Sequence, residues 1–316
     1  MKNVIKEKIM CAESIVILSH INQDTDAVGS CFAMREVLRG LGKQAECCMD
    51  EKLEKRMEFF GDDYILKEDA KEEYDLAIVL DCGSIDRLGD RLFIYENAKE
   101  KVSVDHHGTN TNFAPYNYVE ENASATGEML FYLFGEWGFE LNDKAAMYLY
   151  GAIAGDSGCF KYSCTSKNTM LAAAELIEYD FDHADVCLKL FDTVNENVMR
   201  LHGHIMNSIR SYADGKLRVV STDEKLLEQY GVNEKDAGDI VSIPRSVEGT
   251  LVAAELKKRN GKIRVSIRAN CDIDVSVVAK ELGGGGHMRA AGATVEAENI
   301  EEAEKTVTDL IIKMCF

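Results

Sequence analysis

Residues 101–108, KVSVDHHG, join a short β-branched run to an acid and two histidines. The run 102–104 predicts the end of a buried strand, because β-branched residues are typical of strands. Asp105, His106 and His107 then lie just past the carboxyl end of that strand, where open α/β sheets bind their ligands. A buried Asp-His pair is also common in purely structural roles, so the neighbouring segments have to decide between the two interpretations.

Two other predicted strands also end on polar side chains. The run SIVILS opens into a loop that carries His20, Asp24 and Asp26, and the run DLAIVL ends on Asp81. A carboxylate at the end of a buried strand is costly unless it is paired or bound to a metal ion. Carboxylates together with imidazoles suit Mn, Fe or Mg better than an ion that prefers thiolates. The alternative stays open that Asp24 or Asp26 only caps the helix that follows.

The order of the predicted elements indicates an α/β fold with a doubly wound parallel sheet. Strands are predicted at 14–19, 44–49, 75–80 and 101–104, and helices at 4–11, 28–39, 124–135 and 142–154. The helix 124–135 is expected to be capped near Ser124 or Thr126. Asp156 follows the last helix, where its charge opposes the helix dipole unless a cation compensates it. Asp156 therefore joins the candidate metal ligands.

Length and composition predict two domains and a restricted set of partners. The chain has 316 residues, of which 46% are hydrophobic and 29% charged. Its 55 acids against 36 Lys plus Arg give a formal net charge of -19, which argues against binding of long duplex nucleic acid and leaves a short phosphorylated ligand open. The 10 cysteines lack C-x-x-C spacing and no apolar run reaches membrane-spanning length, so we expect reduced thiols, a cytoplasmic location and no membrane association. Homodimer formation stays open.

The C-terminal part is expected to form a smaller α/β domain after a helical connector at 181–213. Strands are predicted at 216–221, 249–257 and 261–269, and a helix at 274–282. Arg264, Ser266 and Arg268 alternate along one of these strands, so they share a face that would be apolar in a core strand. This pattern favours a binding surface.

A glycine-rich run, GGGGH, follows the predicted helix of this domain. Gly284, Gly285 and Gly286 are compatible with a simple C-cap of that helix. Glycines also let backbone N–H groups approach a phosphate closely, and His287 would add a charge-assisted donor. We favour the phosphate-binding interpretation.

Six motifs together resemble one family. HINQDTD at 20–26, VLD at 79–81, DHH at 105–107 and GDSG at 155–158 resemble the four motifs of the DHH phosphoesterase family, and RVSIR at 264–268 with GGGHMRAAG at 284–292 resembles its DHH-associated domain. The architecture is similar to that of bacterial nanoRNases and pAp phosphatases, a branch that includes phosphodiesterases of pApA or cyclic di-AMP. The resemblance implies a DHH catalytic domain at 1–180 and a substrate-binding domain at 214–316, with the active site in the cleft between them.

The resemblance also implies the role of each site residue. One divalent ion would be held by His20, Asp24 and Asp81, and a second by Asp26, Asp81, His106 and Asp156, with Asp81 as the bridge. His107 would face the scissile phosphate, and Asp105 would orient its neighbours. The family metal is usually Mn²⁺, and two such ions would activate a water for in-line attack, so no protein nucleophile is required. The substrate-binding residues would be Arg264, Ser266, Arg268, Gly284, Gly285, Gly286 and His287.

The chain departs from the usual family pattern beside these ligands. Gln23 and Thr25 stand where a Pro and a Gly or Ala are usual, and GDSG replaces the usual TDTG around Asp156. Because none of these departures removes a ligand, we expect them to affect the shape of the loops. Cys82, next to Asp81, is expected to pack under the sheet instead of acting as a nucleophile.

The predicted function is that of a two-metal phosphodiesterase that cleaves very short 5'-phosphorylated RNA or dinucleotides such as pApA, with removal of the 3'-phosphate of pAp as an added activity. A cyclic di-AMP phosphodiesterase is the alternative enzyme, and a nucleotide-binding sensor without turnover is the non-enzymatic alternative. A RecJ-like exonuclease is less favoured because the chain is acidic and has no added strand-binding domain. The GGGGH run argues against an inorganic pyrophosphatase.

Overall fold

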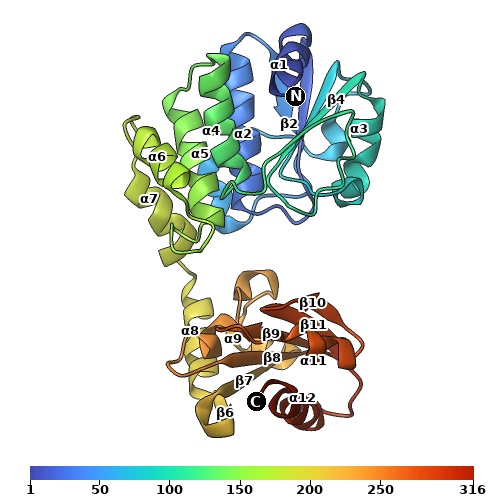
Figure 1. The fold of residues 1–316 in the computed structure, drawn as a ribbon, viewed down its shortest axis with the longest axis vertical. Coiled ribbons are helices and arrows are strands. Elements are labelled where there is room, and N and C mark those ends of the chain that lie inside the picture. Colours follow the sequence, from blue (N-terminus) through green and yellow to red (C-terminus); the bar gives the residue numbers. More distant parts are fainter. The chain divides into compact units, whose positions relative to one another are not determined.

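The computed structural model describes residues 1–316 as two compact units, Met1–Thr193 and Val194–Phe316 (Figure 1). The boundary falls inside the segment 181–213, for which the sequence predicts a connector. Helix α7 (His183–Cys187) and the π-helical turn η4 (Leu188–Asp192) lie in the first unit, and α8 (Glu196–Asn207) lies in the second.

The first unit contains a five-stranded sheet in the order β2-β1-β3-β4-β5. Its strands are β1 (Ser14–Leu18), β2 (Gln44–Cys47), β3 (Leu76–Leu80), β4 (Glu100–Asp105) and β5 (Tyr116–Val119). Every neighbouring pair is parallel, which confirms the predicted parallel sheet. In this strand order the direction of winding changes between β1 and β3, and ligands bind at the carboxyl ends of the strands beside that point.

Helices cover both faces of this sheet. Ile15 and Ile17 of β1 pack into one core, while Val16 and Leu18 pack into another on the opposite face. The helices of the first core are α1 (Lys2–Cys11), α2 (Thr25–Gly40), α4 (Thr126–Trp137), α5 (Asp143–Asp156) and α6 (Lys167–Leu176). The turn η3 (Ile85–Arg91) and helix α3 (Leu92–Asn97) lie on the other face. Two further 3-10 turns, η1 (Lys55–Phe60) and η2 (Lys67–Asp69), follow β2 and precede β3 in the sequence. Figure 1 shows α2, α4 and α5 side by side.

Three of the differences from the sequence-based expectations concern β5, α4 and α5 of the first unit. The half-buried strand β5, sequence YNYV, was not expected because it has no buried apolar run. Helix α4 begins at Thr126, and neither Ser124 nor Thr126 caps it: the N-cap residue Ala125 has no capping side chain. Helix α5 continues through Asp156, so this acid is the last helical residue.

The second unit contains a six-stranded sheet in the order β10-β11-β9-β8-β7-β6. Its strands are β6 (Arg210–Tyr212), β7 (Leu217–Asp223), β8 (Val252–Arg259), β9 (Lys262–Ala269), β10 (Gly285–His287) and β11 (Ala290–Val295). Only β7 and β8 pair in parallel. The β8–β9 hairpin turns through Asn260 and Gly261, which have φ of +50° and +73°, as a two-residue turn of this kind requires.

Two cores hold this unit together. One joins the sheet to α11 (Ser276–Glu281) and α12 (Ile300–Cys315), and the other joins β7 to α8 and α9 (Glu224–Tyr230). The short turns η5 (Ala213–Gly215), η6 (Lys235–Ala237) and α10 (Ser242–Arg245) complete the unit. In neither unit is any helix long and apolar enough to cross a membrane.

Candidate metal centre

The first ligand group consists of His20, Asp24 and Asp81, whose ligand atoms lie within 4.8 Å of one another. Asp24 has two roles, because its Oδ1 accepts a hydrogen bond from the Ala27 N–H at 3.0 Å and so caps α2, while Oδ2 lies 3.6 Å from His20 Nε2. The His20 Nδ1 contacts the Ile21 carbonyl oxygen at 2.8 Å, which turns Nε2 toward Asp81 Oδ2 at 3.5 Å. The capping and ligand interpretations of Asp24 are therefore compatible.

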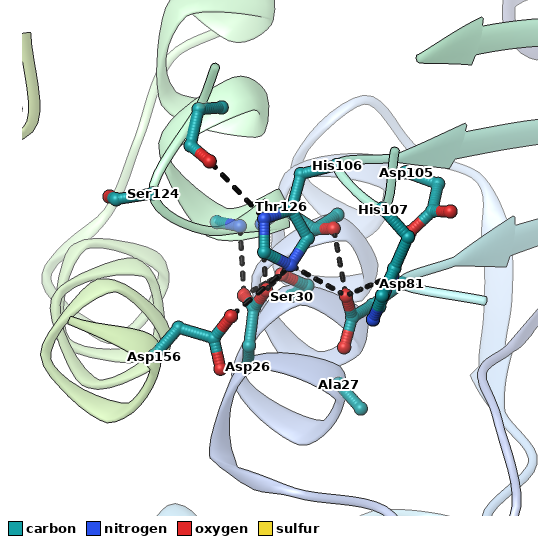
Figure 2. Close-up of polar contacts among 12 residues, drawn as sticks. Asp26, Ala27, Ser30, Asp81, Asp105, His106, His107, Ser124, Thr126 and Asp156 are labelled. Atoms are coloured by element: carbon teal, nitrogen blue, oxygen red, sulfur yellow. Dashed lines mark hydrogen bonds and ion pairs between the residues drawn. The ribbon is translucent and has the colours of Figure 1, made fainter. Parts of the chain in front are cut away.

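The second group consists of Asp26, His106 and Asp156, within the same 4.8 Å limit. Figure 2 shows the His106 ring among the three carboxylates of Asp26, Asp81 and Asp156. Its Nε2 lies 3.1 Å from Asp156 Oδ2, 3.5 Å from Asp81 Oδ1 and 3.9 Å from Asp26 Oδ2. The Nδ1 atom contacts the Ala123 carbonyl oxygen at 3.2 Å, so the ring orientation is fixed by the backbone.

Asp81 lies between the two groups. Its Oδ2 faces His20, and its Oδ1 faces His106 at 3.5 Å and His107 at 3.7 Å. Its backbone is in the left-handed region, with φ of +54°, which is uncommon outside glycine and turns the chain at the end of β3. Strained backbone conformations of this kind cluster at functional sites.

Asp105 and His107 form a separate pair beside this centre. Asp105 is fully buried, and its Oδ1 lies 2.7 Å from His107 Nδ1. Asn110 donates to the other oxygen, Oδ2, at 2.6 Å. Burial raises the pKa of Asp105, but the hydrogen bonds from His107 and Asn110 outweigh burial and leave that pKa below its ordinary value. Asn110 carried no signal in the sequence.

The N-terminus of α4 binds two of the carboxylates. The N–H groups of Thr126 and Gly127 donate to Asp26 Oδ2 and Oδ1 at 2.7 and 2.9 Å, and Ser30 Oγ donates to Oδ1 at 3.0 Å. Thr126 Oγ1 also donates to Asp81 Oδ1 at 3.1 Å. Thr126 thus contacts candidate ligands of both groups, and the sequence did not predict these contacts.

The charges of this centre suit divalent cations. Burial, followed by the nearby charges of Asp81 and Asp156, raises the pKa of Asp26 well above its ordinary value. The ion pairs of these carboxylates are all with histidines. Burial lowers the pKa of His106, but Asp156, Asp26 and Asp81 outweigh it and raise that pKa to about 10. The donor set of carboxylate oxygens and imidazole nitrogens fits Mn²⁺ or Mg²⁺, and His20 and His106 would bind such ions as neutral imidazoles.

A buried arginine fixes the loop that carries His20. The Arg91 guanidinium is 1% exposed and donates to the carbonyl oxygens of Ser19 at 2.8 Å and Cys48 at 2.9 Å, at the ends of β1 and β2. Gln23 is also buried: its amide donates to Ser19 Oγ at 2.8 Å and accepts from the Asp50 N–H at 2.9 Å. Gln23, one of the departures from the family pattern, therefore holds this loop against the end of β2.

Cys82 is fully buried and unsuited to nucleophilic attack. Burial raises the pKa of its thiol to about 12, and Sγ donates to the Ser84 carbonyl oxygen at 3.2 Å. A thiol with so high a pKa is protonated near neutral pH. The expectation that Cys82 packs under the sheet is therefore confirmed.

In the second unit, Arg264, Ser266 and Arg268 are more exposed than the alternating residues of β9, which are buried. Lys257 pairs with Arg264 across the hairpin, and Gly292 pairs with Ser266 on the other side. This cationic face of β9 borders the hairpin formed by β10 and β11.

The glycine run has two structural roles. The Gly283 N–H donates to the Lys280 carbonyl oxygen and the Gly284 N–H to that of Ala279, which is the hydrogen-bond pattern of a Schellman C-cap for α11. Gly285 and Gly286 instead enter β10 with His287 and pair with β11. The C-cap alternative thus accounts for only the first part of the run.

Two family domains cover most of the chain. Residues 14–153 match the DHH family, N-terminal domain, and residues 217–313 match the DHHA1 domain.

Two relatives extend the match along nearly the whole chain. The bifunctional oligoribonuclease and PAP phosphatase NrnA of Bacillus subtilis is 29% identical over 315 residues, which cover 98% of this chain and 97% of that protein. The protein of the same name from Thermus thermophilus is 29% identical over 310 residues, with 94% and 89% covered.

Solved structures agree on the fold. An exopolyphosphatase-related protein from Bacteroides fragilis has a TM-score of 0.90 at 22% identity, with 99% of this chain and 95% of that chain covered. Exonuclease RecJ bound to manganese has a TM-score of 0.56 at 17% identity, with 99% and 93% covered. The chain thus combines a DHH-family N-terminal domain with a DHHA1 domain in a hydrolase that acts on phosphoester bonds.

Proposed function

We propose that this protein is a Mn²⁺-dependent phosphodiesterase that cleaves very short 5'-phosphorylated oligoribonucleotides and linear dinucleotides such as pApA to mononucleotides. The observation that carries the proposal is the place of Asp81, whose two oxygens face the two ligand groups. Two ions bound there would lower the pKa of a water ligand and neutralise charge on the phosphate.

The residues around this centre have distinct roles in the proposed reaction. His20 and Asp24 would hold one ion, and Asp26, His106 and Asp156 would hold the other. Asp81 would contribute one oxygen on the His20 side and one on the His106 side. Asp105 holds the Nδ1 side of His107, so the opposite ring nitrogen, Nε2, is available to a phosphate oxygen. Thr126 and Ser30 keep the carboxylates of Asp81 and Asp26 in fixed orientations.

Substrate length is the finer part of the proposal. The net charge of -19 disfavours long nucleic acids, whereas Arg264 and Arg268 supply a small cationic surface in the second unit. His287 of β10 lies in register with Arg268 across β11. Ser266 and Gly284, Gly285 and Gly286 would add hydroxyl and backbone donors. The named activities of the Bacillus subtilis relative, oligoribonuclease and PAP phosphatase, motivate pApA, short RNA and pAp as substrates.

Two alternatives define the test. Hydrolysis of cyclic di-AMP is the alternative enzymatic function, and nucleotide binding without turnover is the non-enzymatic alternative. Rates on pApA, cyclic di-AMP, pAp and RNA of increasing length should be compared with Mn²⁺, with Asp81→Ala as the inactive control. We expect pApA and the shortest RNA to be cleaved fastest. Faster cleavage of cyclic di-AMP would favour the alternative enzyme, and equal binding with no cleavage would favour a sensor.

Location and assembly complete the proposal. The 10 cysteines are free thiols, as expected for a cytoplasmic protein. Light scattering of the full chain would decide whether it forms the homodimer that the sequence leaves open.

A further inference from the structure

Helices α2 and α5 approach closely at two successive turns. At one turn, a Cβ atom placed on Gly29 of α2 would lie 2.6 Å from the Tyr148 carbonyl oxygen and 3.0 Å from Ala152 Cβ, both of α5. Non-bonded atoms do not tolerate such distances in packed interiors. The glycine on α2 therefore makes room for the backbone and side chains of α5.

At the next turn the arrangement is reversed. A Cβ atom placed on Gly155 of α5 would lie 2.7 Å from Thr25 Cβ and 3.1 Å from Thr25 Cγ2. Here the side chain belongs to α2 and the glycine belongs to α5. Thr25 is 5% exposed, so it has little room to move away from a larger neighbour.

This second contact adjoins the metal ligands on both helices. Thr25 is the first residue of α2 and lies between Asp24 and Asp26, while Gly155 directly precedes Asp156, the last residue of α5. Asp26 and Asp156 both face His106 Nε2, and they come from these two helices (Figure 2). Any change in the spacing of the two helix ends would alter the separation of these carboxylates.

We propose that Thr25 and Gly155 are positioning residues that act as a matched pair: the Thr25 side chain fills the space that Gly155 leaves, and this contact sets the distance between the Asp26 and Asp156 ligands. The inference rests on the proposed function, since it assigns these residues to the second metal group. Gly155 does not have a positive φ, so its role is to leave room for Thr25 and not to adopt a special backbone conformation.

The test is a swap of the two side chains, measured by calorimetric Mn²⁺ titration of the full chain without substrate. We expect Gly155→Ala to weaken one of two bound ions, on the order of 10- to 100-fold, as for other residues that orient metal ligands. The double variant Thr25→Gly with Gly155→Ala should recover most of the lost Mn²⁺ affinity. In this variant the side chain is on residue 155 and the glycine is at residue 25, so the two helices can again pack closely. Gly135→Ala, in α4 with no atom near the added Cβ, is the matched control and should bind both ions normally.

Several results would overturn the inference. If Gly155→Ala binds both ions with wild-type affinity, the contact does not set the spacing of the ligands. The same conclusion follows if the double variant binds Mn²⁺ no more tightly than Gly155→Ala. If Gly155→Ala fails to fold, Thr25→Gly alone is decisive, because it removes the contact without overcrowding and should still weaken one ion. Absence of Mn²⁺ binding in the wild-type protein would instead contradict the proposed function itself.

Discussion

The Thr126 backbone N–H donates a hydrogen bond to Asp26 Oδ2 at 2.7 Å, although the two residues are 100 positions apart in sequence. Helix α4 has no capping side chain of its own, so the Asp26 carboxylate takes that place. The positive end of the α4 dipole thereby stabilises the charged form of Asp26, which burial and the nearby carboxylates of Asp81 and Asp156 destabilise. The Thr126 hydroxyl extends this support to Asp81.

Thr126→Val tests the hydroxyl alone. The variant keeps the N–H that binds Asp26 and loses the donor to Asp81, a hydrogen bond to a charged group worth about 1.5–3 kcal/mol. We expect Mn²⁺ affinity and kcat/KM to fall on the order of tenfold or more. Thr126→Ser keeps a hydroxyl and should stay near the wild type. Equal activity of Thr126→Val and wild type would show that the Thr126 hydroxyl does not support the centre.

Asp105→Asn tests whether this acid acts through His107. The substitution keeps the size of the side chain but replaces the charged acceptor that fixes His107 Nδ1. We expect kcat to fall about 10- to 100-fold while Mn²⁺ affinity stays unchanged. The exposed acid Asp86 provides the control, since Asp86→Asn should alter neither quantity. Loss of metal binding in Asp105→Asn would show instead that Asp105 supports the ligands directly.

Arg268→Ala tests the cationic face of β9. If Arg268 binds a phosphate, KM for pApA should rise about tenfold to a hundredfold in the variant, as expected for loss of a charge-assisted hydrogen bond. The KM of the variant should also depend less on salt concentration than the KM of the wild type. Mn²⁺ affinity should not change. Lys258→Ala is the matched control, because Lys258 lies on the alternate face of the neighbouring strand β8. An equal rise in KM for both variants would point to net charge and not to a specific contact.

Glu304→Gln tests a partly buried ion pair in the second unit. Both Glu304 oxygens bind Arg210, and Tyr212 Oη donates to one of them at 2.6 Å. Burial raises the pKa of Glu304, but these partners outweigh it and lower that pKa below its ordinary value of 4.5. A lowered folded-state pKa stabilises the protein above pH 4.5, and this contribution is lost as the pH falls through the folded-state value.

We therefore expect Glu304→Gln to reduce the free energy of unfolding by about 1.5–3 kcal/mol at pH 7, with a smaller difference from wild type below pH 4. Urea unfolding at both pH values measures this. Glu301→Gln, an exposed neighbour on α12, should have little effect. A difference that grows in acid would contradict the sign of the pKa shift.

The strand tips of the first unit could be predicted because two physical signals coincide there. Apolar runs define the buried parallel strands, and parallel strands bring their carboxyl ends to one edge, so Asp81 and His106 had to lie close together. The motif resemblance then divided the candidate ligands between two groups. Strand β5 lacked such a run and was missed.

The supporting contacts could not be predicted in the same way. Arg91 binds backbone carbonyl oxygens, and Thr126 binds side chains from two other elements, so neither leaves a periodic or local pattern. The fit of Thr25 against Gly155 depends on how two helices pack, which a single sequence does not reveal. Local chemistry thus predicts the candidate ligands, while their orientation depends on tertiary packing.

We propose that Asp81 joins the two candidate metal groups into one hydrolytic centre. The most direct measurement is the initial rate of pApA hydrolysis by metal-stripped protein, with and without added Mn²⁺, for wild type and Asp81→Asn. We expect Mn²⁺ to restore hydrolysis in the wild type and Asp81→Asn to stay inactive although it remains folded. Hydrolysis without added metal, or an active Asp81→Asn variant, would contradict it.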